Sequence, residues 1–212
     1  NKKSGGINSL KYNNKELLCE ELKPNFWRAP IDNDMFYTLK DIFPILKKMN
    51  IGQRWKKATD NRKVENIVIN EEDDNVRVIV KSRVFSTEDG LTTTYTFYTD
   101  GAVKVENQLV PIKNMVRFGM QMAVKKDYNI MTWYGRGFHE SYVDRKESAM
   151  VGVYSAPCED LVHDYLVPQE NGNRTDIRWA KITNKNQEGI KIMDITGEFI
   201  NMSMWPYTMK DL

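Results

Sequence analysis

Apolar and polar residues alternate with a period of two along most of this sequence, and that pattern restricts the folds available to it. The clearest instance is a pair of runs rich in β-branched and aromatic residues, 91–99 and 102–110, on either side of Asp100-Gly101. An Asp-Gly pair between alternating runs predicts a β-hairpin with a type I′ turn, whose two central residues both take positive φ. A second hairpin is predicted for 66–70 and 76–81, across the polar residues 71–75.

Further strands follow from the same alternation. They are expected at 115–124, 129–134, 177–182, and 189–195 followed by 198–204 across a Thr196-Gly197 turn. Strands at such short spacing, joined by turns, are typical of an antiparallel sandwich. We therefore expect an all-β fold.

One segment has a helical period instead. Between Asp41 and Trp55, four apolar residues fall on one face of a helix, and Pro44 suits its first turn. No internal repeat and no linker rich in Pro, Gly or Ser divides the chain. We expect one β-sandwich domain over 1–212, carrying one helical insertion.

Composition excludes several classes of protein. The chain has 31 Lys and Arg against 29 Asp and Glu, a net charge of +2, so no excess of positive charge favours nucleic acid. Its uncharged apolar stretches are far shorter than the roughly 20 residues of a membrane span. Neither nucleic acid nor a membrane is expected as a partner. Cys19 and Cys158 fit no metal-binding spacing, and one long-range disulfide between them is left open.

The first of three polar clusters spans 24–34 and contains two prolines and two aromatic residues. Its candidate site residues are Trp27, Arg28, Asp32, Asn33 and Asp34. Such a loop could stack against a sugar and hydrogen-bond to it, or could brace itself by pairing Arg28 with Asp32 or Asp34. The spacing does not continue as an EF-hand, so no cation site is predicted.

The second cluster spans 133–145 and contributes Arg136, His139 and Glu140 as candidates. The triplet from His139 to Ser141 suggests a hydrolase, but a nucleophile and its base must meet in space, and chain neighbours usually point apart. The Gly-Arg-Gly run lacks the third glycine of a dinucleotide-binding loop. The alternative is a buried network of arginine and carboxylate groups that holds a long loop.

The third cluster, 168–179, contributes Glu170, Asn171 and Arg174. Its donors and acceptors suit a saccharide, and Trp179 could stack on a sugar ring. Equally, Asn-Gly forms turns, and Glu170 or Asp176 could anchor an arginine.

Glycoside hydrolysis usually needs two carboxyl groups at a fixed separation. The carboxylates of these clusters lie on separate loops, and the sequence alone does not show which two of them lie close together in space. We assign no catalytic residue and no metal ligand.

Taken together and in this order, the three clusters resemble the C-terminal, small-chain region (domain 5) of the large β-galactosidases of glycoside hydrolase family 2. The residues that carry the resemblance are Asn25 to Asp34, then Trp133 to Gly137 with Glu140, Tyr142, Asp144 and Arg145, then Pro168 to Thr175. The similarity extends from about Leu10 to Tyr207.

The resemblance implies a large distorted antiparallel sandwich similar to galactose mutarotases, packed beside a (β/α)-barrel. That barrel holds both catalytic glutamates and Mg²⁺, with Na⁺ as a second candidate, in a different part of the polypeptide. The parent would hydrolyse terminal β-D-galactosides with retention, as a homo-oligomer. The segment from about Met35 to Phe43 would lie near the barrel mouth and shape the aglycone side.

The sequence also departs from the family pattern. Phe138 stands where the family usually has Pro, Ser141 where it has Asn, and Phe36 where Gly is common. The chain does not begin with Met, and it stops after Trp205 to Leu212, before the late Trp of the family. We expect a piece of a longer polypeptide, truncated at the C-terminal end of the domain and inactive alone.

Two other hypotheses stay open: a mutarotase-like enzyme or autonomous carbohydrate-binding module, and a packing module that only braces the barrel. The sequence leaves the compartment, bacterial cytoplasm or periplasm, undecided.

Overall fold

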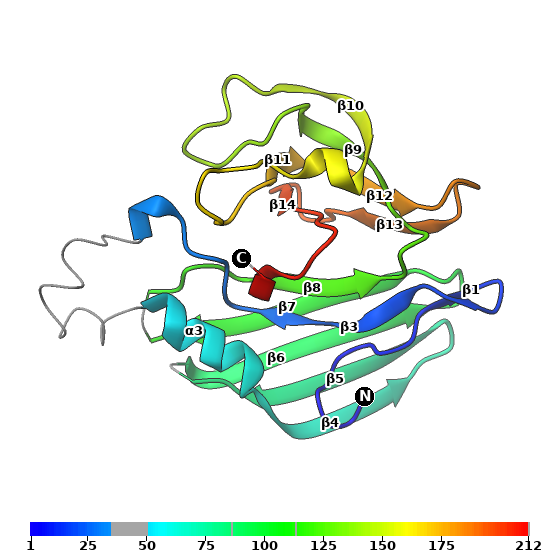
Figure 1. Cartoon of the computed structure of the whole chain (residues 1–212). Helices are drawn as coiled ribbons and strands as arrows, with labels where there is room; N and C mark the ends of the chain where they lie inside the picture. The colour runs from blue at the N-terminus through cyan, green and yellow to red at the C-terminus, as the bar shows by residue number, and fades with distance from the viewer. Residues whose placement is uncertain (35–50, 86, 113, 212) are drawn as a thin grey trace, which may run out of the picture. The chain divides into compact units, whose positions relative to one another are not determined.

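The computed structural model describes residues 1–34, 51–85, 87–112 and 114–211. Strands dominate, several antiparallel sheets are present, and the expected all-β fold is confirmed (Figure 1). The described residues form two compact units. The first consists of 1–10, 18–28 and 51–123, and the second of 11–17, 29–34 and 124–211. The single domain over 1–212 stays a prediction.

Unit 1 is built on a four-stranded sheet in the order β4-β5-β6-β7, with β3 and β8 paired separately. Its elements are β3 (Leu18–Asn25), α3 (Ile51–Asp60), β4 (Lys63–Glu71), β5 (Asn75–Arg83), β6 (Thr87–Tyr98), β7 (Val103–Pro111) and β8 (Gly119–Val124). The hairpin predicted from 66–70 and 76–81 is confirmed as β4 and β5, which pair antiparallel. The strand predicted to begin at residue 115 begins four residues later, as β8.

The predicted helix lies largely outside the described residues, since only its last part falls in α3. There the helix continues beyond Trp55, the expected end, to Asp60. The indole of Trp55 is buried beside the Phe26 ring, with 6.0 Å between ring centroids, in a core that includes Val84 and Leu91. Its Nε1 donates to the Asn114 carbonyl at 2.8 Å, so the ring is both buried and hydrogen-bonded.

The hairpin of β6 and β7 is confirmed, but the type I′ turn is wrong. The loop has three residues, 99–101, because the Tyr98 N–H donates to the Ala102 carbonyl at 2.9 Å and the Gly101 N–H to the Tyr98 carbonyl at 3.1 Å. Within this loop only Gly101 takes positive φ, 88°. This is the three-residue alternative, in which a left-handed glycine closes a bulge. The Asp-Gly pair predicted the position of the turn correctly and its type incorrectly.

This geometry predicts a penalty for Gly101→Ala. No atom lies within 4 Å of a Cβ built at Gly101, so the whole cost comes from the left-handed backbone, about 1 kcal/mol in the free energy of unfolding. Gly119→Ala is the matched control: its Cβ also has open space, and its φ is not left-handed. Urea unfolding should separate the two variants. Equal midpoints would contradict the assigned turn.

Unit 2 is built on a four-stranded sheet in the order β10-β9-β12-β13, with two further strand pairs, β11-β14 and β1-β2. Its elements are β1 (Lys11–Tyr12), β2 (Lys15–Glu16), η1 (Asp32–Asp34), β9 (Ile130–Gly137), β10 (Met150–Pro157), η2 (Cys158–Leu161), β11 (Arg174–Ile177), β12 (Trp179–Thr183), β13 (Gly189–Met193), β14 (Ile200–Met202) and η3 (Met209–Asp211). The core under this sheet centres on the fully buried ring of Trp133, with Met131, Ile177 and Ala180.

Two strand predictions in this unit need correction. The run 177–182 is interrupted at Arg178, so that β11 and β12 belong to different sheets. The runs on either side of Thr196-Gly197 are not a hairpin, because β13 pairs with β12 while β14 pairs with β11. The turn itself is real: the Asp194 carboxylate accepts hydrogen bonds from Thr196, Gly197 and Phe199, which hold its pKa at about 2. The hydrogen bonds of a turn are formed between residues close in the chain, whereas the pairing of a strand depends on segments far from it in the chain.

Cys19, which is exposed, and Cys158, which is buried, form no disulfide with each other. Burial raises the pKa of the Cys158 thiol to about 11, which disfavours the reactive thiolate. Among the described helices, none has the length and apolar character to cross a membrane.

Candidate functional site

The candidates of the second and third clusters lie in unit 2, where the carboxylate of Glu140 accepts three hydrogen bonds. One oxygen accepts the Gly172 N–H at 2.7 Å, and the other accepts Arg145 Nη2 at 2.6 Å and the Tyr165 hydroxyl. Burial alone would raise the pKa of Glu140, but these hydrogen bonds outweigh it and hold the pKa below its ordinary value. Glu140 is therefore an ionised anchor at neutral pH.

Arg174 lies deeper, with only 3% of its surface exposed. Its Nη1 donates to the Leu161 and Gly172 carbonyls, each at 2.7 Å, and Nη2 donates to the Phe138 carbonyl at 3.2 Å. Its guanidinium lies 5.5 Å from the centre of the Trp133 ring. Burial lowers the pKa of Arg174. One side chain thus fastens three separate segments above the core.

The serine beside Glu140 has no place in a hydrolytic triad. Ser141 is fully buried, and its hydroxyl bonds the Thr175 hydroxyl at 2.9 Å and accepts the Thr175 N–H at 3.1 Å. His139 is exposed and contacts Ser148 instead, at 3.1 Å. The two residues have different partners, as their adjacency in the chain suggested.

Arg136 of the second cluster lies in a part-buried network with Asp176 of the third cluster. Its Nε donates to Asp176 at 2.7 Å, and its Nη1 donates to the Lys146 and Ala149 carbonyls. Lys146 Nζ adds a second cation 3.0 Å from Asp176. Burial would raise the pKa of Asp176, but these two cations lower it. The pair braces the loop of residues 138–149 between β9 and β10.

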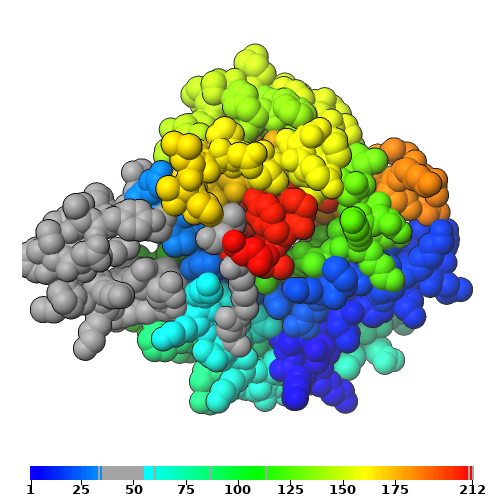
Figure 2. Space-filling view, in the orientation of Figure 1, coloured from blue at the N-terminus to red at the C-terminus, as the bar shows by residue number. Residues whose placement is uncertain are grey.

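Asn171 connects the third cluster to the C-terminal residues. Its side-chain nitrogen donates to the Gln169 carbonyl and to the Tyr207 hydroxyl, at 3.0 and 3.2 Å. The Trp205 Nε1 donates to the Asn171 carbonyl at 3.0 Å, and the Trp205 and Tyr207 rings stack with 9° between their planes. Figure 2 shows the C-terminal residues, in red, beside this yellow segment. No sequence signal indicated this contact.

The acidic half of the first cluster also reaches the third cluster. The Asp32 N–H donates to Gln169 Oε1 at 3.2 Å, and Gln169 Nε2 donates back to the Asp32 carboxylate at 3.1 Å. Asp34 accepts the Ile31 N–H at 3.0 Å. Glu170 is buried, and its N–H donates to the Pro30 carbonyl at 3.4 Å. Gln169 lies within the third cluster but was not named as a candidate, and its partner Asp32 is 137 positions away in the chain.

The other half of the first cluster belongs to unit 1. Trp27 is only 6% exposed, and Lys56 Nζ lies 4.1 Å from the centre of its ring. The Asn25 side chain bonds both the N–H and the carbonyl of Trp27, at 3.1 and 2.8 Å. Little of this ring is open for stacking on a sugar. Arg28 is half-buried in the same unit, and Asn33 lies in η1 of unit 2.

The site is therefore a set of closed hydrogen-bond and ion-pair networks. A glycosidase general acid needs a raised pKa, whereas the pKa values of Glu140 and Asp176 are lowered. Among the described residues, no group of three or more His, Cys, Asp or Glu side chains could hold a metal ion. This arrangement can fix loop conformation and present polar groups.

Comparison with known proteins gives the same family as the resemblance carried by the three clusters. A family model described as the β-galactosidase small chain matches residues 1–212. The chain belongs to this family. It is 34% identical to a β-galactosidase of Priestia megaterium over 214 aligned residues and 29% identical to one of Halalkalibacterium halodurans over 216. These matches cover 100% and 98% of the chain, and the chain spans 20% of the length of each relative.

Proposed function

We propose that this chain is the part of a glycoside hydrolase family 2 β-galactosidase that packs beside the catalytic part and shapes its substrate pocket. The observation that carries the proposal is the match of all 212 residues to the small-chain family, beside relatives five times as long. The parent would hydrolyse terminal β-D-galactosides with retention and assemble as a homo-oligomer. The mutarotase-like form of the sandwich belongs to the same proposal.

The lowered pKa values of the carboxylates in unit 2 favour a structural role for this chain over a catalytic one. A retaining glycosidase needs two carboxyl groups roughly 5 Å apart, one of them protonated. Glu140 and Asp176 are each bonded to cations with lowered pKa values, so neither suits the acid. The catalytic glutamates and Mg²⁺, with Na⁺ as a second candidate, would therefore come from the rest of the parent.

The contribution of this chain would be to hold loops in place. Glu140 and Arg174 fasten the segments around Gly172, and Gln169 ties them to Asp32. Polar groups held by several bonds lose little entropy when a ligand binds, which favours affinity. Asp32, whose side chain is exposed, is the sugar-contact candidate that this scaffold positions.

The proposal predicts that the purified chain does not hydrolyse a chromogenic β-galactoside, and that co-expression with the remaining part of its parent polypeptide restores hydrolysis. Release of the chromophore measures both. Glu140→Gln, which weakens the scaffold, should lower the restored activity more than Glu106→Gln on the surface of β7. Hydrolysis by the chain alone, at constant specific activity through purification, would contradict the proposal. Sugar mutarotation by the chain would favour the mutarotase-like alternative.

A further inference from the structure

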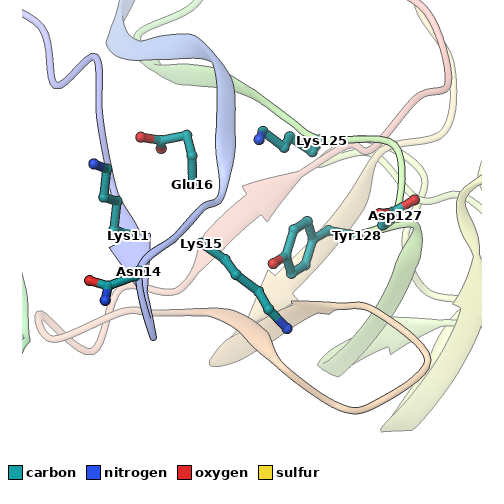
Figure 3. A pocket seen from close by; sticks show the side chains of 7 residues that line it. All are labelled: Lys11, Asn14, Lys15, Glu16, Lys125, Asp127 and Tyr128. Atoms are coloured by element: carbon teal, nitrogen blue, oxygen red, sulfur yellow. The ribbon is translucent and has the colours of Figure 1, made fainter.

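Unit 2 contains a hollow of about 450 Å³ that the proposed function does not use. It lies between the short β1-β2 hairpin and the loop that precedes β9 (Figure 3). Its lining residues are Lys11, Asn14, Lys15, Glu16, Lys125, Asp127 and Tyr128. Small-molecule sites typically measure ~300–1,000 Å³, so the space suits a ligand of one or two sugar rings.

The walls of this hollow are fixed by the backbone. Asn13 and Asn14 take left-handed conformations, with φ of 48° and 61°, and Tyr12 pairs with Lys15 across them. Two consecutive left-handed residues in a two-residue loop are typical of the type I′ turn, which holds a hairpin rigidly. On the opposite wall, the Tyr128 N–H donates to the Lys125 carbonyl at 2.9 Å. The hollow is therefore formed before any ligand arrives.

The charges around the hollow select against most ligand classes. Three lysines, Lys11, Lys15 and Lys125, line the hollow together with two acidic residues, Glu16 and Asp127. Lys15 Nζ also lies 3.4 Å from the carboxylate of Glu188. The carboxylates would repel a polyanion, the ammonium groups would repel a cation, and an apolar ligand would strip water from all of them. A neutral molecule with many hydroxyl groups satisfies both signs, because each hydroxyl donates one hydrogen bond and accepts others.

Tyr128 points to the same class of ligand. Its side chain is only 7% exposed, yet its hydroxyl is directed from the loop toward the hairpin across the hollow (Figure 3). In the described part of the chain, no protein group hydrogen-bonds to this hydroxyl or to the ammonium groups of Lys11 and Lys125. The hollow thus presents donors without protein acceptors, beside an aromatic edge.

We propose that this hollow is a secondary saccharide-binding site that takes neutral mono- or disaccharides, separate from any pocket shaped under the proposed function. Lys11, Lys125 and Tyr128 bind sugar hydroxyls as donors, and Asp127 and the Asn14 amide accept from them.

The test is a titration of the ¹⁵N-labelled 212-residue chain with lactose, followed by amide resonances. Saturable shifts confined to residues 11–16 and 125–128, with millimolar affinity, are expected. Tyr128→Phe removes one hydroxyl and should weaken lactose binding 3- to 10-fold, the range of about one neutral hydrogen bond. Asn14→Gly keeps the turn but removes the side-chain amide, and it should weaken lactose binding by a similar factor. Tyr12→Phe, on the same hairpin but outside the lining, is the matched control and should bind as the wild type does.

Three results would overturn the proposal. The first is the absence of saturable shifts at these residues, and the second is lactose binding that Tyr128→Phe and Tyr12→Phe leave equally unchanged. The third is tighter binding of inorganic phosphate or glycine than of lactose, which would indicate a site for charged ligands. Galactose in place of lactose distinguishes a single-ring site from a two-ring site. Because the titration uses no hydrolysis, its outcome does not depend on whether the parent is a β-galactosidase.

Discussion

Replacing Arg174 with methionine is expected to lower the free energy of unfolding by about 3 kcal/mol, the larger of the two stability losses predicted for unit 2. Methionine keeps much of the buried volume but donates no hydrogen bond. The carbonyls of Leu161 and Gly172, both in buried residues, would lose their donor, and each such group costs about 1–3 kcal/mol. Phe138 is exposed, so its carbonyl can accept a hydrogen bond from water in place of Arg174.

Urea unfolding measures this effect, with the amide resonances of β9 reporting on unit 2. Arg77→Met is the matched control, since Arg77 is 44% exposed and its ion pair with Glu72 spans 3.6 Å. Such a surface pair contributes about 0–1 kcal/mol. Arg174→Lys keeps the charge but loses the guanidinium donors. Its free energy of unfolding should therefore lie between those of the wild type and Arg174→Met. Equal losses for Arg174→Met and Arg77→Met would show that the three carbonyl contacts do not hold unit 2 together.

Replacing Glu140 with glutamine is expected to lower the free energy of unfolding at neutral pH by about 2 kcal/mol. The carboxylate side chain is 8% exposed, and it loses its charge-assisted bonds to Gly172 and Arg145. The effect stays below the 3–5 kcal/mol of a broken buried pair because Arg145 is 54% exposed, and water screens the attraction. Glu106→Gln, at an exposed pair with Lys104, is the control.

The same variant tests the lowered pKa of Glu140. A carboxyl whose pKa is lower in the folded state stabilises the fold above its unfolded pKa, about 4.3, and loses that contribution as pH falls through the folded value. The stability gap between wild type and Glu140→Gln should therefore be full at pH 7 and shrink below about pH 4. Urea midpoints across this range measure it. A gap that widens in acid would mean that burial, not the surrounding donors, dominates the pKa.

Several elements of the fold were predictable because their signals are local. The alternation in 66–70 and 76–81 predicted a hairpin, and β4 and β5 form it. Asp100-Gly101 marked a turn, and Gly101 has the left-handed φ that such a turn needs. The turn type was wrong because two- and three-residue loops differ in the hydrogen bonds that close them, and the same Asp-Gly pair serves both.

The candidate site was predictable as a set of residues, and its connections were not. Glu140, Asn171 and Arg174 stood out by type and by their resemblance to a family, and unit 2 brings them together. Their partners Tyr165, Trp205 and Tyr207 were not named as candidates, and neither was Gln169, although it lies inside the 168–175 motif, because contacts between distant segments leave no local pattern in the sequence. The hollow beside Asn13-Asn14 was likewise unmarked, since its lining comes from two segments more than a hundred residues apart.

The sequence by itself determined the all-β class, the positions of most strands and turns, and the family, since each depends on residues within one short stretch or on the order of such stretches. Only the tertiary structure decided that β12 pairs with β9, that Asp32 meets Gln169 137 positions later, and that Glu140 receives the Gly172 N–H. The physical reason is that alternation specifies which face of a strand is buried and does not specify its neighbour. Contacts between distant segments depend on the paths of whole loops, which no local pattern encodes.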